Sequence, residues 1–497
     1  MSELEFVALV LAAIGPLLAV AKLAGVPPLF LLVGAGLGSA FLPGLPPLRV
    51  DPQLLLSLFL PPLLYAGTAQ ASVHLLRFAA LSGVLVGALV SISTILAVAA
   101  AARWLLLPGL GWVPALLLGV VATVFDTRLF QEAKGRPHVP RAVADALKAR
   151  EMASRVVALS TLSLVVGSLQ AGPPDPLLAA GRLLWAIGAG AALGVALGGA
   201  IVWLRERVEP APVEIAVSIA TPYLCSLGAR WLGLSVVVVV MAAALTVTAV
   251  RVDRETGAPR TSAEARISAV AFWEEVGLLV SSVMFLLAGR ALPEAMADLG
   301  HWPVWRMAGT AAALLLVVLS VQFAISFLST ALPPLAAAVR ERQGDAEGGS
   351  AKARAATAAV MAWACTRSVI GLVVALSLPA ALEDRGLVLV VASLLILGSV
   401  LLQGLTLRLA VRAAALGEEA EEKREEELAT RAANDAAEEA EEGEHGLDAA
   451  RRALFGLRET DRIGDEVLRK MLREADLKAR AAEGPAAALP GASPPNP

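Results

Sequence analysis

Long apolar stretches separated by short polar segments run along the chain from about residue 5 to residue 412. A helix needs about 20 predominantly apolar residues to cross a bilayer. By that measure the pattern predicts thirteen membrane-crossing segments, near residues 5–22, 28–43, 53–71, 78–102, 113–130, 150–170, 177–203, 213–229, 233–250, 269–291, 303–331, 355–381 and 387–412. Only Arg230 and Trp231 mark a turn between 213 and 250, so one long re-entrant segment is an alternative interpretation there.

Composition supports this prediction. The chain is 57% hydrophobic and 17% charged, whereas soluble proteins are about 25% charged, so a soluble enzyme is excluded. The chain contains no Gly-x-x-x-x-Gly-Lys-Ser/Thr loop for ATP. Its two cysteines both lie in apolar segments and its four histidines are scattered. We therefore expect neither enzymatic activity nor a cofactor, and no structural metal site.

The composition changes after residue 412, where a strongly acidic, helix-favouring run begins. We predict a transmembrane domain over 1–412 and a partly helical acidic tail over 413–497. Within the tail, residues 448–482 space their apolar side chains like one face of a helix. The Pro- and Ala-rich end, 484–497, is expected to be disordered.

Basic residues concentrate in alternate loops between the predicted segments. Because cytoplasmic loops carry an excess of Lys and Arg, this predicts an outside N-terminus and a cytoplasmic tail, in the inner membrane of a bacterial cell. The N-terminal residues lack the positive region of a secretory signal, so the first segment is expected to remain a span. The loops assigned to the cytoplasm contain Lys22, then His74 and Arg77, then Lys134, Arg136, Arg141 and Lys148, then Arg205 and Arg207, then Arg251, Arg254, Arg260 and Arg266, and finally Arg340, Arg342, Lys352 and Arg354.

Several charges lie inside the apolar segments. Inserting a charged side chain at the centre of a bilayer costs roughly 2.5–3.5 kcal/mol of free energy even on the lowest insertion scales, so such a residue usually has a functional role. Asp126 lies between Thr123 and Thr127, whose hydroxyls could join a carboxylate and backbone carbonyls in binding an ion at a helix interruption. The pattern indicates an ion or proton path; the alternative is that Asp126 only neutralises a nearby arginine.

Smaller signals concern helix packing. Gly190, Gly194 and Gly198 recur every four residues, which is typical of closely packed helices, either within a protomer or at a dimer interface. Gln322 and Gln403 are expected to form hydrogen bonds between helices.

Several motifs, in order, resemble those of a known family. They are Leu60-Pro-Pro-Leu-Leu-Tyr, Phe272-Trp-Glu-Glu, the run that begins Thr366-Arg-Ser-Val-Ile-Gly, and Leu402-Gln-Gly-Leu-Thr-Leu. They are similar to motifs of the sodium/proton antiporters of the cation:proton antiporter superfamily, the NhaP and sodium/hydrogen exchanger type. The resemblance implies an all-α inverted-repeat fold with discontinuous helices, a moving core domain and a dimerisation domain. It also implies a homodimer that exchanges a monovalent cation (Na⁺, with Li⁺ and K⁺ as further candidates) for protons.

The sequence departs from this family at its ion site. The family's Thr-Asp-Pro reads Phe125-Asp126-Thr127 here, and its Asn-Asp pair falls on Ser154-Arg155. An arginine keeps its proton at every physiological pH, so Arg155 cannot take part in the competition between proton and cation. The family's glutamate falls on Arg150, with Glu151 beside it, and Arg367 matches the arginine that normally pairs with that glutamate. The resulting candidates for ion or proton binding are Asp126, Thr123, Thr127, Ser154 and Glu151, with Arg155, Arg150 and Arg367 as charge-compensating residues.

Three interpretations of this site remain open. The expected one is a compensated exchanger in which Asp126, alone or with Glu151 or Glu275, carries the proton. In the second, an internal Asp126–Arg155 salt bridge leaves a non-transporting scaffold or sensor. In the third, Arg150, Arg155 and Arg367 attract an anion, and the protein is an anion carrier.

Overall fold

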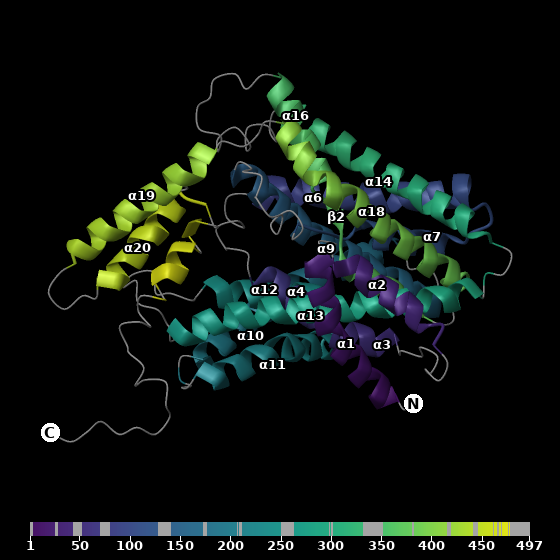
Figure 1. The fold of residues 1–497 in the computed structure, drawn as a ribbon, viewed down its shortest axis with the longest axis horizontal. Coiled ribbons are helices and arrows are strands. Elements are labelled where there is room, and N and C mark those ends of the chain that lie inside the picture. The colour runs from purple at the N-terminus through teal and green to yellow at the C-terminus, as the bar shows by residue number, and fades with distance from the viewer. Residues whose placement is uncertain are drawn as a thin grey trace.

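The described part of the chain is almost entirely helical in the computed structural model (Figure 1). The structure describes residues 3–24, 28–42, 52–69, 80–127, 141–171, 176–205, 211–249, 263–297, 302–331, 351–379, 382–414, 419–440 and 446–460, with positions 207 and 299 and parts of 462–477. Most of the loops used to predict the orientation of the chain, and the predicted disordered end, lie outside these residues.

Helices occupy every predicted segment. The first half of the chain contains α1 (Glu3–Ala24), α2 (Pro28–Ser39), α3 (Pro52–Leu58), α4 (Leu60–Thr68), α6 (Ala80–Ala101), the π-helical turn η1 (Ala102–Leu106), α7 (Trp112–Thr123), α9 (Arg141–Ala171), α10 (Pro176–Arg205) and α11 (Ala211–Trp231). The second half contains α12 (Val236–Ala249), α13 (Ala263–Ala297), α14 (Val304–Ala331), α16 (Ala351–Trp363), α17 (Val369–Leu376), α18 (Arg385–Ala414), α19 (Glu419–Glu438) and α20 (Gly446–Glu459).

Six of the described helices are long and apolar enough to cross a membrane, namely α6 with η1, α9, α10, α13, α14 and α18. Five shorter apolar helices of 10–17 residues accompany them. Leucines such as Leu85, Leu89 and Leu96 are exposed on α6, as expected of side chains that face lipid. The chain is an integral membrane protein, and the number of thirteen complete crossings stays a prediction.

Prolines interrupt one predicted segment, and the region with two alternative predictions forms two helices. The segment 53–71 breaks at Phe59, because Pro61 and Pro62 begin a new helix and lack the N–H groups that would continue the previous one. The region 213–250 forms two helices, α11 and α12, with Gly233 at φ +65° in the turn. The single re-entrant segment is therefore not what forms.

The other interruptions meet in the interior. β1 (Phe125–Asp126) follows α7, and β2 (Thr366–Arg367) lies between α16 and α17. The two extended segments pair in antiparallel orientation, with Phe125 opposite Arg367 and Asp126 opposite Thr366. This confirms the discontinuous helices that the family resemblance implied.

Two groups of helices surround this crossing (Figure 1). In one, α6 packs against α7, α9 and α14, and α18 packs against α7, α14 and α16. In the other, α12 packs against α4, α10 and α11, while α13 packs against α2, α4 and α11. α13 also contacts α17 and α18, so the groups meet beside the helix crossing.

The stripe of Gly190, Gly194 and Gly198 lies against α12. A Cβ atom on Gly194 would approach the carbonyl oxygen of Val239 to 2.5 Å, and one on Gly198 would lie 2.8 Å from Cβ of Thr246. The spacing therefore reflects close packing of α10 on α12 within the protomer.

The tail has a small core of its own. Leu454 of α20 is buried with Ala429 and Ala433 of α19 and with Ile463 and Val467. The prediction of one helical face over 448–482 is wrong in its extent, because α20 ends at Glu459. The chain turns after α20, with the Arg462 N–H donating to the Leu457 carbonyl, and so returns Ile463 and Val467 to the same apolar cluster.

The α10–α12 contact yields a stability prediction. We expect Gly194→Ala to lower the free energy of unfolding by about 1–3 kcal/mol, because the added methyl group meets rigid backbone. Gly199→Ala is the matched control, since nothing lies within 4 Å of the added Cβ. Thermal unfolding in detergent measures both variants; equal melting temperatures would contradict the packing described here.

Candidate functional site

The site is built around backbone carbonyls that the helix interruptions expose. α7 ends at Thr123 and α16 at Trp363, and the last carbonyls of a helix have no partner within it. These ends also carry partial negative charge. The two-residue β1–β2 ladder is too short to satisfy all of them. A positively charged donor at this point therefore stabilises both ends.

Arg367 supplies that donor. Its guanidinium binds the carbonyl of Ala122, lies 3.3 Å from the Thr123 carbonyl and donates to the Cys365 carbonyl at 2.6 Å. The Arg367 side chain is buried. These carbonyls lie at the end of α7 and just beyond α16, whereas the family resemblance implied a pair with a glutamate.

Two glutamines support this arrangement. Gln403 of α18 donates to the carbonyl of Trp363 at 2.9 Å. With its amide oriented to satisfy both neighbours, Gln322 of α14 donates to the Ala362 carbonyl at 3.1 Å and accepts from Arg367. The predicted hydrogen bonds between helices are confirmed for both residues.

Asp126 and α9 together form a cluster of opposite charges. Glu151 binds Arg155 directly, and Lys148 Nζ lies 3.3 Å from Glu151 Oε2. Thr127 donates its hydroxyl to the same oxygen at 2.6 Å. Arg155 also lies 3.7 Å from Asp126 Oδ2. Glu151 is therefore the shared anion of the cluster, and Arg155 lies between the two carboxylates.

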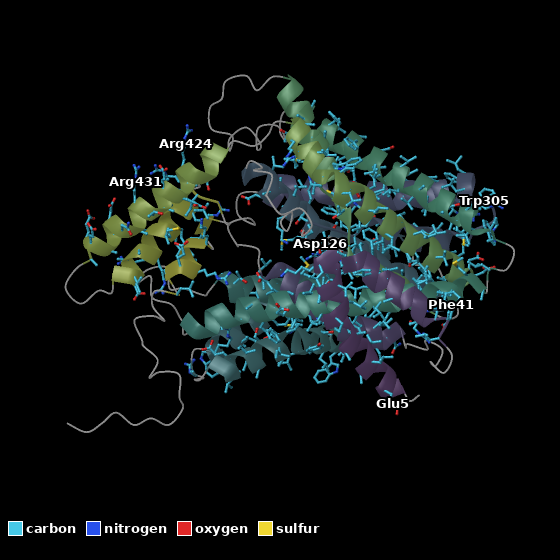
Figure 2. All side chains as sticks on the ribbon, viewed as in Figure 1. Glu5, Phe41, Asp126, Trp305, Arg424 and Arg431 are labelled. Atoms are coloured by element: carbon cyan, nitrogen blue, oxygen red, sulfur yellow. The ribbon has the colours of Figure 1, made fainter. Side chains whose placement is uncertain are left out.

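The two carboxylates differ in their access to solvent. The side chain of Glu151 is 0% exposed and that of Asp126 is 16% exposed. Asp126 lies near the middle of the helical body (Figure 2), at the end of β1, where the Thr366 hydroxyl donates to its backbone carbonyl at 2.9 Å. Within the cluster, Asp126 is thus the more accessible of the two carboxylates.

The remaining predicted residues have other partners. The Thr123 hydroxyl donates to the Gly119 carbonyl at 2.8 Å, and the Ser154 hydroxyl donates to the Glu151 carbonyl at 2.8 Å. The Arg150 guanidinium donates to the hydroxyls of Ser326 and Ser329 on α14, at 3.0 and 3.3 Å. The structure therefore brings Asp126, Thr127, Glu151 and Arg155 together and places Arg150 and Arg367 among uncharged acceptors.

Lys148 is the member of the cluster that the sequence did not reveal. The sequence places it in a loop with Arg141, but it lies within α9, which begins at Arg141, nine residues before the predicted segment. The missed signal is helical spacing, since Lys148 lies three residues before Glu151.

Arg155 fits its place because α4 presents a glycine to it. A Cβ atom on Gly67 would lie 2.6 Å from Arg155 NH1. The Arg155 side chain is 1% exposed, and its NH1 and Nε atoms have no hydrogen-bond partner among the described residues. Gly67 thus provides the space for the guanidinium, and Glu151 provides its counter-charge.

Comparisons with known proteins identify relatives over most of the chain. The profile of a family described as "Sodium/hydrogen exchanger, transmembrane" matches residues 8–413. An uncharacterized Na⁺/H⁺ exchanger of Mycobacterium tuberculosis is 28% identical over 417 residues, which cover 82% of this chain and 73% of that protein. The Na⁺/H⁺ antiporter NhaS2 of a Synechocystis species is 27% identical over 48% of this chain and 43% of its own length.

The fold has a counterpart among solved structures. The sodium proton antiporter MjNhaP1 of Methanocaldococcus jannaschii superposes with a TM-score of 0.60 and 15% sequence identity, covering 84% of this chain and 99% of that one. At this identity the likeness shows a shared fold.

The contact between Gly67 and Arg155 yields a second stability prediction. We expect Gly67→Ala to lower the free energy of unfolding by about 1–3 kcal/mol, because the methyl group displaces a guanidinium paired with buried Glu151. In an Arg155→Lys background, where the branched end of the side chain is absent, the same change should cost much less. A double-mutant cycle of thermal unfolding measures this coupling, and additive effects would show that the two residues do not interact.

Proposed function

The chain belongs to the sodium/hydrogen exchanger family of transmembrane transporters, and on this premise we propose that Asp126 is the carboxylate for which cation and proton compete. The protein exchanges a monovalent cation for protons across the membrane. Na⁺ is the proposed substrate, with Li⁺ and K⁺ as further candidates. The observation that carries the proposal is the position of Asp126, a partly exposed carboxylate at a helix break.

Exchange at one carboxylate needs a group that holds either a proton or a cation. Glu151 is unsuited, because it is fully buried and already bound to Arg155, Lys148 and Thr127. Glu275, the other candidate carrier, is exposed on α13. Asp126 combines solvent access with a place between the two helix groups, where an alternating movement could expose it to either side.

Arg155 does not abolish this competition. A proton and Na⁺ are both positive, so the guanidinium lowers the affinity of Asp126 for each of them. Glu151 binds Arg155 more closely than Asp126 does, and so offsets part of the repulsion. We infer that Arg155 tunes cation affinity downward while exchange is retained.

The contacts favour exchange over the two other interpretations. A silent scaffold would need Arg155 to hold Asp126, yet the closer partner of Arg155 is Glu151. An anion carrier would use Arg150, Arg155 and Arg367 together. In the described structure they face different partners: serines of α14, the carboxylates, and helix-end carbonyls.

Family membership also suggests an oligomeric state and a location for the protein. We propose that it is a homodimer in the inner membrane of a bacterial cell, with the N-terminus outside and the tail in the cytoplasm. The basic loops of the sequence support this orientation.

The first functional prediction concerns Asp126. In liposomes containing a pH-sensitive dye, Na⁺, Li⁺ or K⁺ added against a pH gradient should move protons through the wild-type protein. Asp126→Asn should abolish this flux, because an amide neither binds a proton nor neutralises a cation. Glu275→Gln, the same chemical change at an exposed site, should leave it unchanged. Equal flux through Asp126→Asn and wild type would refute the role of Asp126.

The second functional prediction concerns Arg155. Two unit charges about 5 Å apart interact by roughly 3 kcal/mol at an effective dielectric constant of 20. We therefore expect Arg155→Met to lower the KM for Na⁺ by about tenfold or more. Lys148 and Thr127 keep Glu151 partnered in this variant. Arg290→Met removes another buried arginine, which binds the Ser39 carbonyl on α2, and should not change KM. A higher KM in Arg155→Met would mean that Arg155 assists cation binding.

A further inference from the structure

Three helix ends meet at one boundary of the membrane helices. A Cβ atom on Gly87 of α6 would lie 2.7 Å from Cα of Arg150, and Arg150 binds Ser326 and Ser329 in the last turns of α14. The beginning of α6 therefore lies beside the end of α14, so η1, which follows α6, lies beside the beginning of α14. η1 contacts α14 and also α7, the next helix along the chain. Trp305 marks this boundary, on the side of the helical body away from α19 (Figure 2).

Tryptophans are exposed on all three helix ends. Trp104 of η1 is 67% exposed, Trp112 at the start of α7 is 46% exposed and Trp305 of α14 is 76% exposed. η1 closes one candidate membrane span, and α14 opens another. Tryptophans at the ends of membrane spans lie at the level of the lipid headgroups. These side chains therefore face the headgroup region of the bilayer.

Two arginines lie over tryptophan rings at this boundary. The guanidinium carbon of Arg103 lies 5.1 Å from the centroid of the Trp112 ring, and that of Arg306 lies 4.4 Å from the Trp302 ring. Such a cation–π contact holds a guanidinium in place through its face and leaves the N–H groups at its edge for other partners. Arg103 donates one of them to the Leu110 carbonyl, while Arg306 is exposed on the first turn of α14.

The segments that form this boundary carry only positive charge. Residues 102–112 and 302–312 contain Arg103 and Arg306 and neither Asp nor Glu. The beginnings of α7 and α14 add partial positive charge. The anion that a bilayer offers at this level is the phosphate of a phospholipid, and a planar guanidinium can bind a phosphate through two parallel hydrogen bonds. Charge and depth thus both fit a lipid headgroup.

Another arginine–tryptophan pair lies in a different electrostatic setting. The guanidinium carbon of Arg207 lies 4.0 Å from the centroid of the Trp203 ring, and Arg207 donates to the Trp203 carbonyl at 2.9 Å. Glu206 and Glu209 flank it in the sequence. It also follows the end of α10, and the end of a helix carries partial negative charge. An arginine over an exposed tryptophan therefore does not by itself make a boundary positive.

We propose that the boundary of η1, α7 and α14 is a binding site for an anionic phospholipid. The guanidinium groups donate to the phosphate, and the tryptophans contact the glycerol backbone and the adjoining part of the acyl chains. A free phosphate ion could use the same donors, but only a ligand with an apolar part also uses the exposed rings. The positive charge disfavours the ammonium group of a zwitterionic lipid. The site consists of Arg103, Trp104, Trp112, Trp302, Trp305 and Arg306.

Lipid binding to the purified full-length protein in detergent tests the proposal. Native mass spectrometry measures the Kd for phosphatidylglycerol and for phosphatidylcholine with the same acyl chains. We expect the wild-type protein to bind phosphatidylglycerol more tightly. The double variant Arg103→Gln/Arg306→Gln should weaken that binding about tenfold or more, because two charged donors are lost, and should leave the Kd for phosphatidylcholine nearly unchanged.

Arg207→Gln is the matched control, since it removes a guanidinium over a tryptophan at another boundary, and its Kd should equal that of wild type. Arg306→Gln alone keeps the contact between Arg103 and the Leu110 carbonyl. This variant should weaken phosphatidylglycerol binding severalfold with an unchanged melting temperature, which separates loss of the site from loss of folding.

Three results would overturn the proposal. They are equal affinity of the wild-type protein for the two lipids, an unchanged affinity for phosphatidylglycerol in the double variant, and an equal loss in Arg207→Gln. Displacement of the lipid by millimolar inorganic phosphate would also overturn it, because the site would then be one for the free ion. Binding is measured without transport, so the result does not depend on the role of Asp126.

Discussion

Two helices end inside the protein, and their exposed carbonyls must find partners, because lipid offers none. Arg367 binds the Ala122 carbonyl at the end of α7 and the Cys365 carbonyl just beyond α16. Its charge offsets the partial negative charge of the helix ends, and its several donors reach carbonyls on two chain segments at once. Gln322, Gln403 and the short β1–β2 ladder complete the arrangement. The break that places Asp126 in the interior is stable only because these donors are present.

A second constraint is the pairing of a buried charge on α9. An arginine stands where the family resemblance places an aspartate, and a buried guanidinium is costly unless it is paired. Glu151, one helical turn earlier, supplies the pair, while Gly67 of α4 leaves room for the guanidinium. The departure from the family pattern is thus accommodated by neighbours on two helices. Asp126 keeps the more exposed position in the cluster, and this is the basis on which we propose it as the exchanging carboxylate.

The charges of the site and of the tail form one series. Arg458, Asp145, Lys148, Glu151, Arg155 and Asp126 alternate in sign from the tail to the helix break. Buried charges interact over longer distances than exposed ones because water screens them less.

The sequence by itself determined the features that depend on local composition. Apolar length located the membrane segments, the four-residue glycine spacing indicated the α10–α12 packing, and the motif order identified the family. The same information marked Asp126, Glu151 and Arg155 as members of a site. It placed Lys148 in a loop, however, because hydropathy alone does not show how far a helix extends beyond its apolar part. Only the tertiary structure decided which charges pair: Arg155 with Glu151, Arg367 with helix-end carbonyls, and Arg458 with Asp145. Those pairings join residues up to 313 positions apart, and such contacts depend on how separate helices meet in space.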